Sequence, residues 1–290
     1  MNEINGILIV NKPKGFTSHD VVAKVKKLLG IKKVGHTGTL DPNATGVLPL
    51  LLNQGTKMSK YLIEHDKEYE VTLKLGIRTS TLDEEGEILE ETQVNWNVIR
   101  SNIDEALQYF IGKQEQIPPI YSAIKVNGKK LYEYARNGEN VELKPRNIEI
   151  YSIELLEVRE VENTIKFKVA CSKGTYIRSL CEDIAKKLGT IGYMKELNRL
   201  KVGKFNIEQA ITLEEIENDK DNIQSKVITM EKFFNDLPKI SLNEKQLNMF
   251  LNGMLIETKN TDGVYNIYTQ KYIGLGIIKS KRLKRDILVN

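Results

Sequence analysis

The first 63 residues alternate between apolar runs, turns and segments of helical period. Residues 6–10 form an apolar run that leads into the turn residues 11–15, which predicts a buried strand ending in a turn. Apolar residues then recur at helical spacing from Val21 to Leu29; Thr17 or Ser18 can cap this helix, and Gly30 can end it. After a loop at 35–46, apolar stretches up to about Ile63 predict further helix.

The middle of the chain mixes strand patterns with helix patterns. Residues 68–75, 146–158 and 164–172 alternate between polar and apolar, as half-buried antiparallel strands do. Residues 98–111 and 175–188 have the apolar period of helices. Because no βα unit repeats, the pattern predicts an α+β fold rather than a doubly wound parallel sheet.

The pattern changes after residues 233–238. A short helix near 246–251 is expected to precede two strands at 263–268 and 272–279. We therefore predict a catalytic-size domain at 1–235 and a small β-rich domain at 236–290. A domain of about 55 residues buries little surface by itself and needs support from its neighbour.

The composition is that of an ordinary globular protein, with 290 residues of which 40% are hydrophobic and 28% charged. No stretch approaches the roughly 18 apolar residues that cross a membrane, and residues 1–5 lack the basic start and apolar core of a signal peptide. Two cysteines, Cys171 and Cys181, are too few for a zinc cluster. We therefore expect a cytoplasmic protein with no membrane association and no metal.

The formal net charge of +4 is unevenly distributed. Lysines crowd residues 12–33 and lysines and arginines crowd residues 279–285, whereas residues 83–91 are strongly acidic. Basic ends around an acidic segment suit a face that binds a polyanion. Charge alone also allows an ordinary solvated surface.

Asp41 is the carboxylate with the most unusual local sequence. Gly35, Gly38 and Gly46 surround it, and Pro42 restricts the backbone directly after it. Such a loop can hold one acid in a fixed orientation, but Asp-Pro also favours an ordinary turn or a helix start. A phosphate-binding P-loop is not indicated, because no Gly-Lys-Ser/Thr follows.

Seven blocks of sequence, in order over some 200 residues, resemble the TruB family of tRNA pseudouridine-55 synthases. The signature loop is residues 35–49, GHTGTLDPNATGVLP. The others are residues 11–18 (NKPKGFTS), 67–70 (KEYE), 78–83 (RTSTLD), 116–125 (QIPPIYSAIK), 171–180 (CSKGTYIRSL) and 200–205 (LKVGKF). Two departures are Ser80, where the family often has an acid, and Lys204, where a proline is frequent.

This resemblance implies an isomerase that detaches a T-loop uracil of tRNA from its ribose and rejoins it through carbon. It implies the pseudouridine synthase fold, which is a mixed, largely antiparallel sheet flanked by helices and loops, with a C-terminal PUA-like RNA-binding domain. The implied partner is the T-arm and elbow of tRNA. We expect no cofactor, no obligate protein partner and a monomeric protein.

The resemblance also implies roles for individual residues. Asp41 would be the catalytic aspartate, Tyr69 the tyrosine under the base, and Arg178 the partner of the aspartate. Lys12 and Tyr176 would help to build the pocket, and His36 would contact RNA near the extruded nucleotide. The full set of expected RNA contacts is Lys12, His36, Thr37, Asp83, Lys173 and Tyr176.

These roles are chemically coherent. An aspartate with a reference pKa of about 3.9 is ionised at neutral pH, and a neighbouring Arg178 is expected to lower its pKa further. Such a carboxylate can attack the anomeric carbon or remove a sugar proton, and the sequence does not choose between them. Extruding a base costs a few kcal/mol, which stacking on Tyr69 can offset by about 1–3 kcal/mol.

Two other functions stay open at the level of sequence. The protein could be a non-catalytic module that binds tRNA or helps it fold, in which the Asp41 loop only grips RNA. It could also be an enzyme acting on a nucleotide or sugar phosphate, for which a magnesium requirement would be the evidence.

Overall fold

The computed structural model describes residues 4–62, 65–122, 124–139 and 141–289. Among these residues, nine strands form the main sheet. Its central path runs, in spatial order, through β1 (Gly6–Lys12), β3 (Thr45–Leu52), β12 (Gly192–Val202), β4 (Lys67–Leu75), β11 (Thr164–Cys171), β10 (Arg146–Arg159) and β7 (Gly112–Gln116). Two short strands lie beside this path, β2 (Val34–His36) on β3 and β13 (Phe205–Asn206) on β12.

All pairings in this sheet are antiparallel except the short parallel contact between β12 and β3. Helices α2 (Trp96–Tyr109) and α4 (Ile177–Lys187) pack with β4, β10 and β11 in one apolar cluster. Helices α1 (Ser18–Leu29) and α5 (Leu213–Asn218) pack with β1 and β3 in another. The predicted α+β fold with a mixed, largely antiparallel sheet is confirmed.

The remaining elements are short. Two small hairpins pair β5 (Ile77–Thr79) with β6 (Ile88–Glu91) and β8 (Lys125–Val126) with β9 (Lys129–Lys130). The other helices before residue 236 are η1 (Asn53–Tyr61), α3 (Leu131–Arg136), η2 (Ile207–Gln209), η3 (Lys220–Lys226) and α6 (Met230–Phe233).

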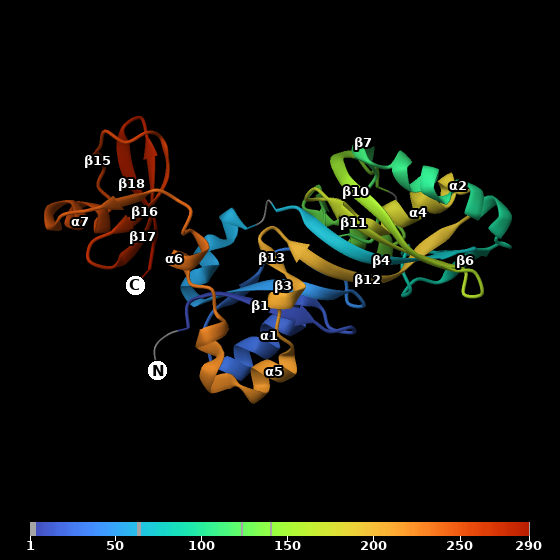
Figure 1. The fold of residues 1–290 in the computed structure, drawn as a ribbon, viewed down its shortest axis with the longest axis horizontal. Coiled ribbons are helices and arrows are strands. Elements are labelled where there is room, and N and C mark those ends of the chain that lie inside the picture. The colour runs from blue at the N-terminus through green and yellow to red at the C-terminus, as the bar shows by residue number, and fades with distance from the viewer. Residues whose placement is uncertain (1–3, 63–64, 123, 140, 290) are drawn as a thin grey trace.

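The C-terminal residues form a second sheet at the opposite end of the molecule from α2 (Figure 1). Its strand order is β14 (Lys239–Ser241), β16 (Gly263–Tyr268), β17 (Tyr272–Lys279), β18 (Arg282–Leu288) and β15 (Ile256–Glu257), with α7 (Glu244–Leu251) beside it. Leu275 and Ile287 of this sheet share an apolar cluster with Ile7 and Phe205 of the main domain. This packing gives the small domain the support that its size requires, and its curled sheet is consistent with a PUA-like domain.

The helix expected from 47 to about Ile63 is wrong in its first half. Residues 45–52 form strand β3, and a 3-10 helix follows only at 53–61; Ile63 lies outside the described residues. Residues 46–52 are all buried, so the strand shows no polar–apolar alternation, and a continuous apolar run of this kind does not distinguish strand from helix.

Among the other strands that were not predicted, β12 and β18 are the longest. Strand β12 occupies the middle of the main sheet, and its pairing with β4 is interrupted by two irregularities, near 194–196 and 199–201. Such bulges break the period of two that identifies a strand. The basic segment near the C-terminus forms strand β18, which buries Leu283 and Ile287 while Arg282, Lys284 and Arg285 stay exposed.

Candidate active site

Asp41 lies in the loop that joins β2 to β3. The loop turns back at once, because the Ala44 amide donates to the Asp41 carbonyl at 3.1 Å. Gly38 and Gly46 bracket the loop with positive φ angles of 77° and 105°. These are conformations that side chains with a Cβ adopt rarely, so the glycines permit the observed path.

Two side chains from the N-terminal segment hold the residues next to Asp41. The Ser18 hydroxyl accepts a hydrogen bond from the Leu40 amide at 2.9 Å and donates to the Leu40 carbonyl at 3.3 Å. The Lys12 ammonium is completely buried and donates to the carbonyls of Pro42 at 2.8 Å, Pro13 at 3.0 Å and Phe16. The backbone on both sides of Asp41 is therefore fixed by buried polar groups.

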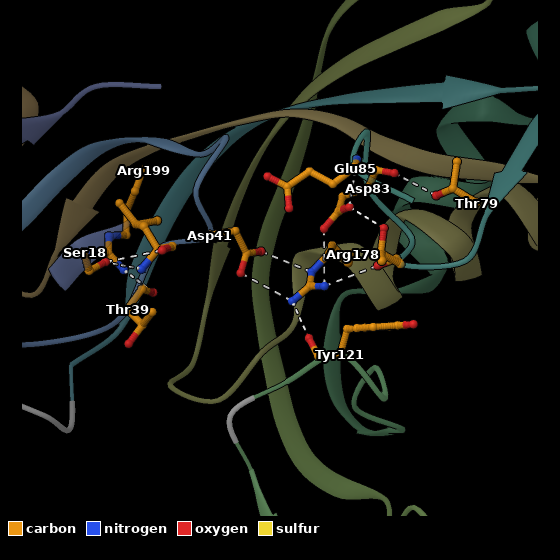
Figure 2. A network of polar contacts seen from close by, with 11 residues as sticks. Ser18, Thr39, Asp41, Thr79, Asp83, Glu85, Tyr121, Arg178 and Arg199 are labelled. Carbon is orange, nitrogen blue, oxygen red and sulfur yellow. Dashed lines mark hydrogen bonds and ion pairs between the residues drawn. The ribbon is translucent and has the colours of Figure 1, made fainter. Parts of the chain in front are cut away.

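Arg178 approaches the Asp41 carboxylate from the first turn of α4 (Figure 2). Its Nε lies 3.1 Å from Oδ2 of Asp41, and its Nη2 lies 3.4 Å from Oδ1, which is a two-point contact. The guanidinium also donates to the carbonyls of Thr81 at 3.2 Å and Tyr121 at 3.0 Å. Only 8% of the Arg178 side chain is exposed, against 38% of the Asp41 side chain. The arginine therefore contacts the carboxylate from the protein interior, and the carboxylate remains partly accessible to solvent.

A second carboxylate shares the same guanidinium. Asp83 Oδ2 lies 3.3 Å from Arg178 Nη1, and Asp83 Oδ1 accepts from the Thr81 hydroxyl at 2.5 Å and from the Glu85 amide at 3.2 Å. Leu82, directly before it, has a φ of 61°, a conformation unusual for leucine. The resulting arrangement is Asp41–Arg178–Asp83, with Glu85 close by in Figure 2.

Arg178 lowers the pKa of Asp41, as expected, but the net shift of that pKa is upward. Burial has the largest influence and raises the pKa of Asp41; Arg178 and Lys12 lower it, and Asp83 raises it again. Burial also raises the pKa of Glu85, and the neighbouring carboxylates of Asp83 and Asp41 add to that rise. The guanidinium thus opposes a desolvation cost that the sequence does not reveal.

Tyr69 lies on β4 and is 7% exposed. It lines the same cavity as Asp41, Arg178 and Tyr176, with a volume of about 120 Å³. Pockets for drug-sized ligands typically measure about 300–1,000 Å³, so this cavity suits only a small group such as one ring. Burial raises the pKa of Tyr69 to about 12, and the phenol is therefore neutral at pH 7 and can donate a hydrogen bond.

The structure brings together Asp41, Tyr69, Arg178, Asp83 and Tyr176 from the predicted set. Asp83, expected to contact RNA, binds Arg178, and its contact with RNA stays a prediction.

Lys12, another expected RNA contact, is completely buried. Its ammonium is bound to backbone carbonyls, among them that of Pro42, and its contact with RNA stays a prediction. Burial lowers the pKa of Lys12 to about 8. That Lys12 helps to build the pocket also stays a prediction.

The remaining expected RNA contacts lie around the site. His36 ends β2 and packs edge to face against His19, with ring centroids 5.2 Å apart. Burial lowers the pKa of His36, with His19 and Arg199 acting in the same direction. Thr37 is buried, whereas Lys173 is exposed in the loop before α4. Their contact with RNA stays a prediction.

Ser18 and Arg199 were missed at the level of sequence. Thr17, not Ser18, caps α1, in a capping box with Asp20, which leaves the Ser18 hydroxyl for Leu40. Arg199 is 1% exposed and donates to two carbonyls of the Asp41 loop, those of Gly38 and Thr39, and to the Val47 carbonyl on β3. Two features of the sequence could have indicated these residues. Ser18 is a second hydroxyl residue beside the helix cap, and Arg199 directly precedes the block at 200–205.

The described residues contain neither a metal-binding cluster nor a membrane-spanning helix. No group of three or more His, Cys, Asp or Glu residues there could hold a metal ion. No helix among them is long and apolar enough to cross a membrane. Cys171 and Cys181 are both free and buried. That catalysis needs no metal or cofactor stays a prediction.

Comparison with known proteins decides the family. A model of the TruB family pseudouridylate synthase N-terminal domain matches residues 26–177, and a model of the tRNA pseudouridylate synthase B C-terminal domain matches residues 178–236. The chain belongs to the TruB family of pseudouridylate synthases. The resemblance predicted from the seven sequence blocks is confirmed, and with it the assignment of the protein as an isomerase that converts uridine to pseudouridine.

Relatives match over nearly the full length. A tRNA pseudouridine synthase B of Caldanaerobacter subterraneus subsp. tengcongensis is 45% identical over 97% of this chain and 98% of its own. That of Clostridium novyi is 44% identical over 99% and 100%. Among solved structures, a Cbf5-Nop10-Gar1 complex matches with a TM-score of 0.71 and 26% identity over 99% of this chain and 84% of that one. An H/ACA RNP bound to a substrate RNA containing 2'-deoxyuridine matches with a TM-score of 0.68 and 26% identity over 97% and 83%.

Proposed function

We propose that the protein is a tRNA pseudouridine synthase that acts on a uridine in the T-loop. The observation that carries the proposal is the Asp41 carboxylate, held by Arg178 beside a ring-sized cavity that Tyr69 lines. Membership of the TruB family and relatives named tRNA pseudouridine synthase B support the substrate class. The proposed reaction uses only side chains of this chain.

The site can separate the tasks of the reaction. Asp41 is the more exposed partner of its ion pair, so an oxygen can reach a sugar while Arg178 keeps its orientation. Attack on the anomeric carbon and removal of a sugar proton both start from this position. The cavity holds about one ring, so the target base must leave the stack, at a cost of a few kcal/mol. Stacking on the Tyr69 ring contributes about 1–3 kcal/mol in return.

The wider RNA surface is proposed from exposed charge. Exposed lysines lie on α1 and just after it, and exposed basic residues lie on β18 of the C-terminal domain: Lys26, Lys27, Lys32, Lys33, Arg282, Lys284 and Arg285. Contacts from both regions to phosphates would orient the T-arm and elbow while the cavity selects the nucleotide. The division into 1–235 and 236–290, the PUA-like RNA-binding role, a monomeric state and a cytoplasmic location are parts of the same proposal.

Replacing Asp41 by Asn tests the proposal against a non-catalytic tRNA-binding role. The assay measures pseudouridine in unmodified T-arm RNA and, separately, the Kd for that RNA. We expect the variant to bind RNA and to form no pseudouridine. The matched control is Asp104→Asn on the exposed face of α2, which should behave as the unmodified protein. Loss of RNA binding in the Asp41→Asn variant would favour the binding-only role, and retained isomerisation would contradict the proposal.

A further inference from the structure

Arg199 is a buried cation with no acidic partner among the ion pairs of the described residues. A buried guanidinium is costly unless its hydrogen bonds are satisfied. Arg199 lies on the central strand β12 with 1% of its surface exposed, and it makes its hydrogen bonds to backbone carbonyls. The guanidinium therefore orients a segment of backbone and does not neutralise a nearby carboxylate among the described residues.

The carbonyls that Arg199 binds lie on both sides of Asp41. Before the aspartate, Nη2 donates to the Gly38 carbonyl at 2.9 Å and Nη1 to the Thr39 carbonyl at 3.5 Å. After it, Nε donates to the Val47 carbonyl at 2.8 Å. One planar group thus joins the two ends of the loop, a geometry that the guanidinium fork permits and a lysine ammonium does not.

The two glycines that bracket the loop both pack against Arg199. A Cβ built on Gly38 would lie 3.3 Å from Arg199 Nη1, and one built on Gly46 would collide with the backbone of Arg199. Gly46 is also the parallel-strand partner of Arg199. The backbone of β12 and the side chain of Arg199 therefore determine the path of the loop at both ends.

We propose that Arg199 is a positioning residue for Asp41: it holds the loop so that the carboxylate stays aligned with Arg178 and the cavity. The inference rests on the proposed function and adds a role for a residue that does not touch the substrate. The guanidinium also lies beside the Tyr69 phenol, whose pKa it lowers against the larger effect of burial. Arg199 thereby contacts both the loop of Asp41 and the tyrosine that lines the cavity.

The test compares Arg199→Ala and Arg199→Lys with the unmodified protein in single-turnover reactions at saturating enzyme. A misplaced carboxylate should lower the rate of Arg199→Ala by about 100-fold while the Kd for T-arm RNA changes by less than about twofold. Ethylguanidine should restore part of the rate of Arg199→Ala, since it can fill the space of the missing side chain. Arg199→Lys keeps the positive charge and should destabilise the fold less than Arg199→Ala does. Its single-turnover rate should also fall. The matched control is Lys201→Ala, an exposed cation on the same strand.

A rate of Arg199→Lys equal to that of the unmodified protein would overturn the inference, because charge alone would then suffice. The inference would also be overturned if the affinity for RNA fell as much as the rate, or if ethylguanidine did not raise the rate of Arg199→Ala. Either result would indicate a general structural role for Arg199. If the unmodified protein forms no pseudouridine, the proposed function fails instead.

Discussion

Removing the guanidinium of Arg178 should damage both folding stability and catalysis. Arg178→Met leaves the carboxylates of Asp41 and Asp83 facing each other without the cation that contacts both. Breaking a buried ion pair costs about 3–5 kcal/mol. Because 38% of Asp41 and 14% of Asp83 are exposed, water offsets part of this cost, and we expect about 3 kcal/mol, the lower end.

The expected change is large enough to measure by thermal or urea unfolding. A loss of about 3 kcal/mol corresponds to a fall in Tm of roughly 5 °C in a chain of this size. Isomerisation should fall to the level of Asp41→Asn. The loss of Arg178 also removes an influence that lowers the pKa of Asp41, so any residual activity should require a higher pH.

Arg178→Lys separates charge from geometry. Lysine keeps the positive charge, but it cannot make the two-point contact with Asp41 and also reach Asp83 and the Tyr121 carbonyl. We expect part of the stability to return without the activity. Arg100→Met is the control, since Arg100 forms an exposed pair with Glu160, and it should change neither quantity. Full activity of Arg178→Lys, or an unchanged Tm of Arg178→Met, would refute the reasoning.

Three further predictions concern the loop, pH and salt. Ser18→Ala removes the hydroxyl bound to the Leu40 amide and carbonyl; urea unfolding should show a loss of about 1–3 kcal/mol for the unsatisfied buried group, with slower turnover, and no change in either would contradict this role. Burial lowers the pKa of Lys12 in the folded protein from 10.5 to about 8, so turnover should fall as the pH rises through about 8. Between pH 8 and 10.5 the lysine keeps its proton only in the unfolded chain, and the free energy of unfolding should therefore rise with pH over this range. A turnover rate that stays constant up to pH 9 would contradict the role of Lys12. So would a decrease in rate that occurs at the same pH in the Lys12→Arg variant. The affinity for tRNA should fall steeply between low and physiological salt, because bound phosphates release counterions; a Kd independent of salt would exclude the proposed basic surface.

The polar–apolar alternation of residues 68–75 predicted a strand with one buried face. Residues 68–75 alternate strictly in burial, and strands 263–268 and 272–279 have the expected bounds. Strand β3 failed because it is buried on both faces, and β12 because its bulges interrupt the period. Both are interior strands of the main sheet, whose environment depends on partners far away in the sequence.

The ordered sequence blocks predicted the residues of the site itself. They did not predict the residues that position the Asp41 loop. Asp41, Tyr69 and Arg178 lie in blocks that resemble the TruB family, and the structure places them around one cavity. Arg199 looks like a surface arginine in a polar strand, and only the bulged pairing of β12 reveals that it is buried. The upward shift of the Asp41 pKa was likewise invisible, because desolvation depends on packing of the whole site.

Mapping pseudouridine along an unmodified tRNA transcript is the most direct test of the central claim. The transcript is incubated with the protein without added metal or cofactor, and each uridine is then examined for conversion. We expect one converted uridine, in the T-loop, and none when the Asp41→Asn variant is used. Conversion at other uridines only, or no conversion by a folded protein that binds the transcript, would contradict it.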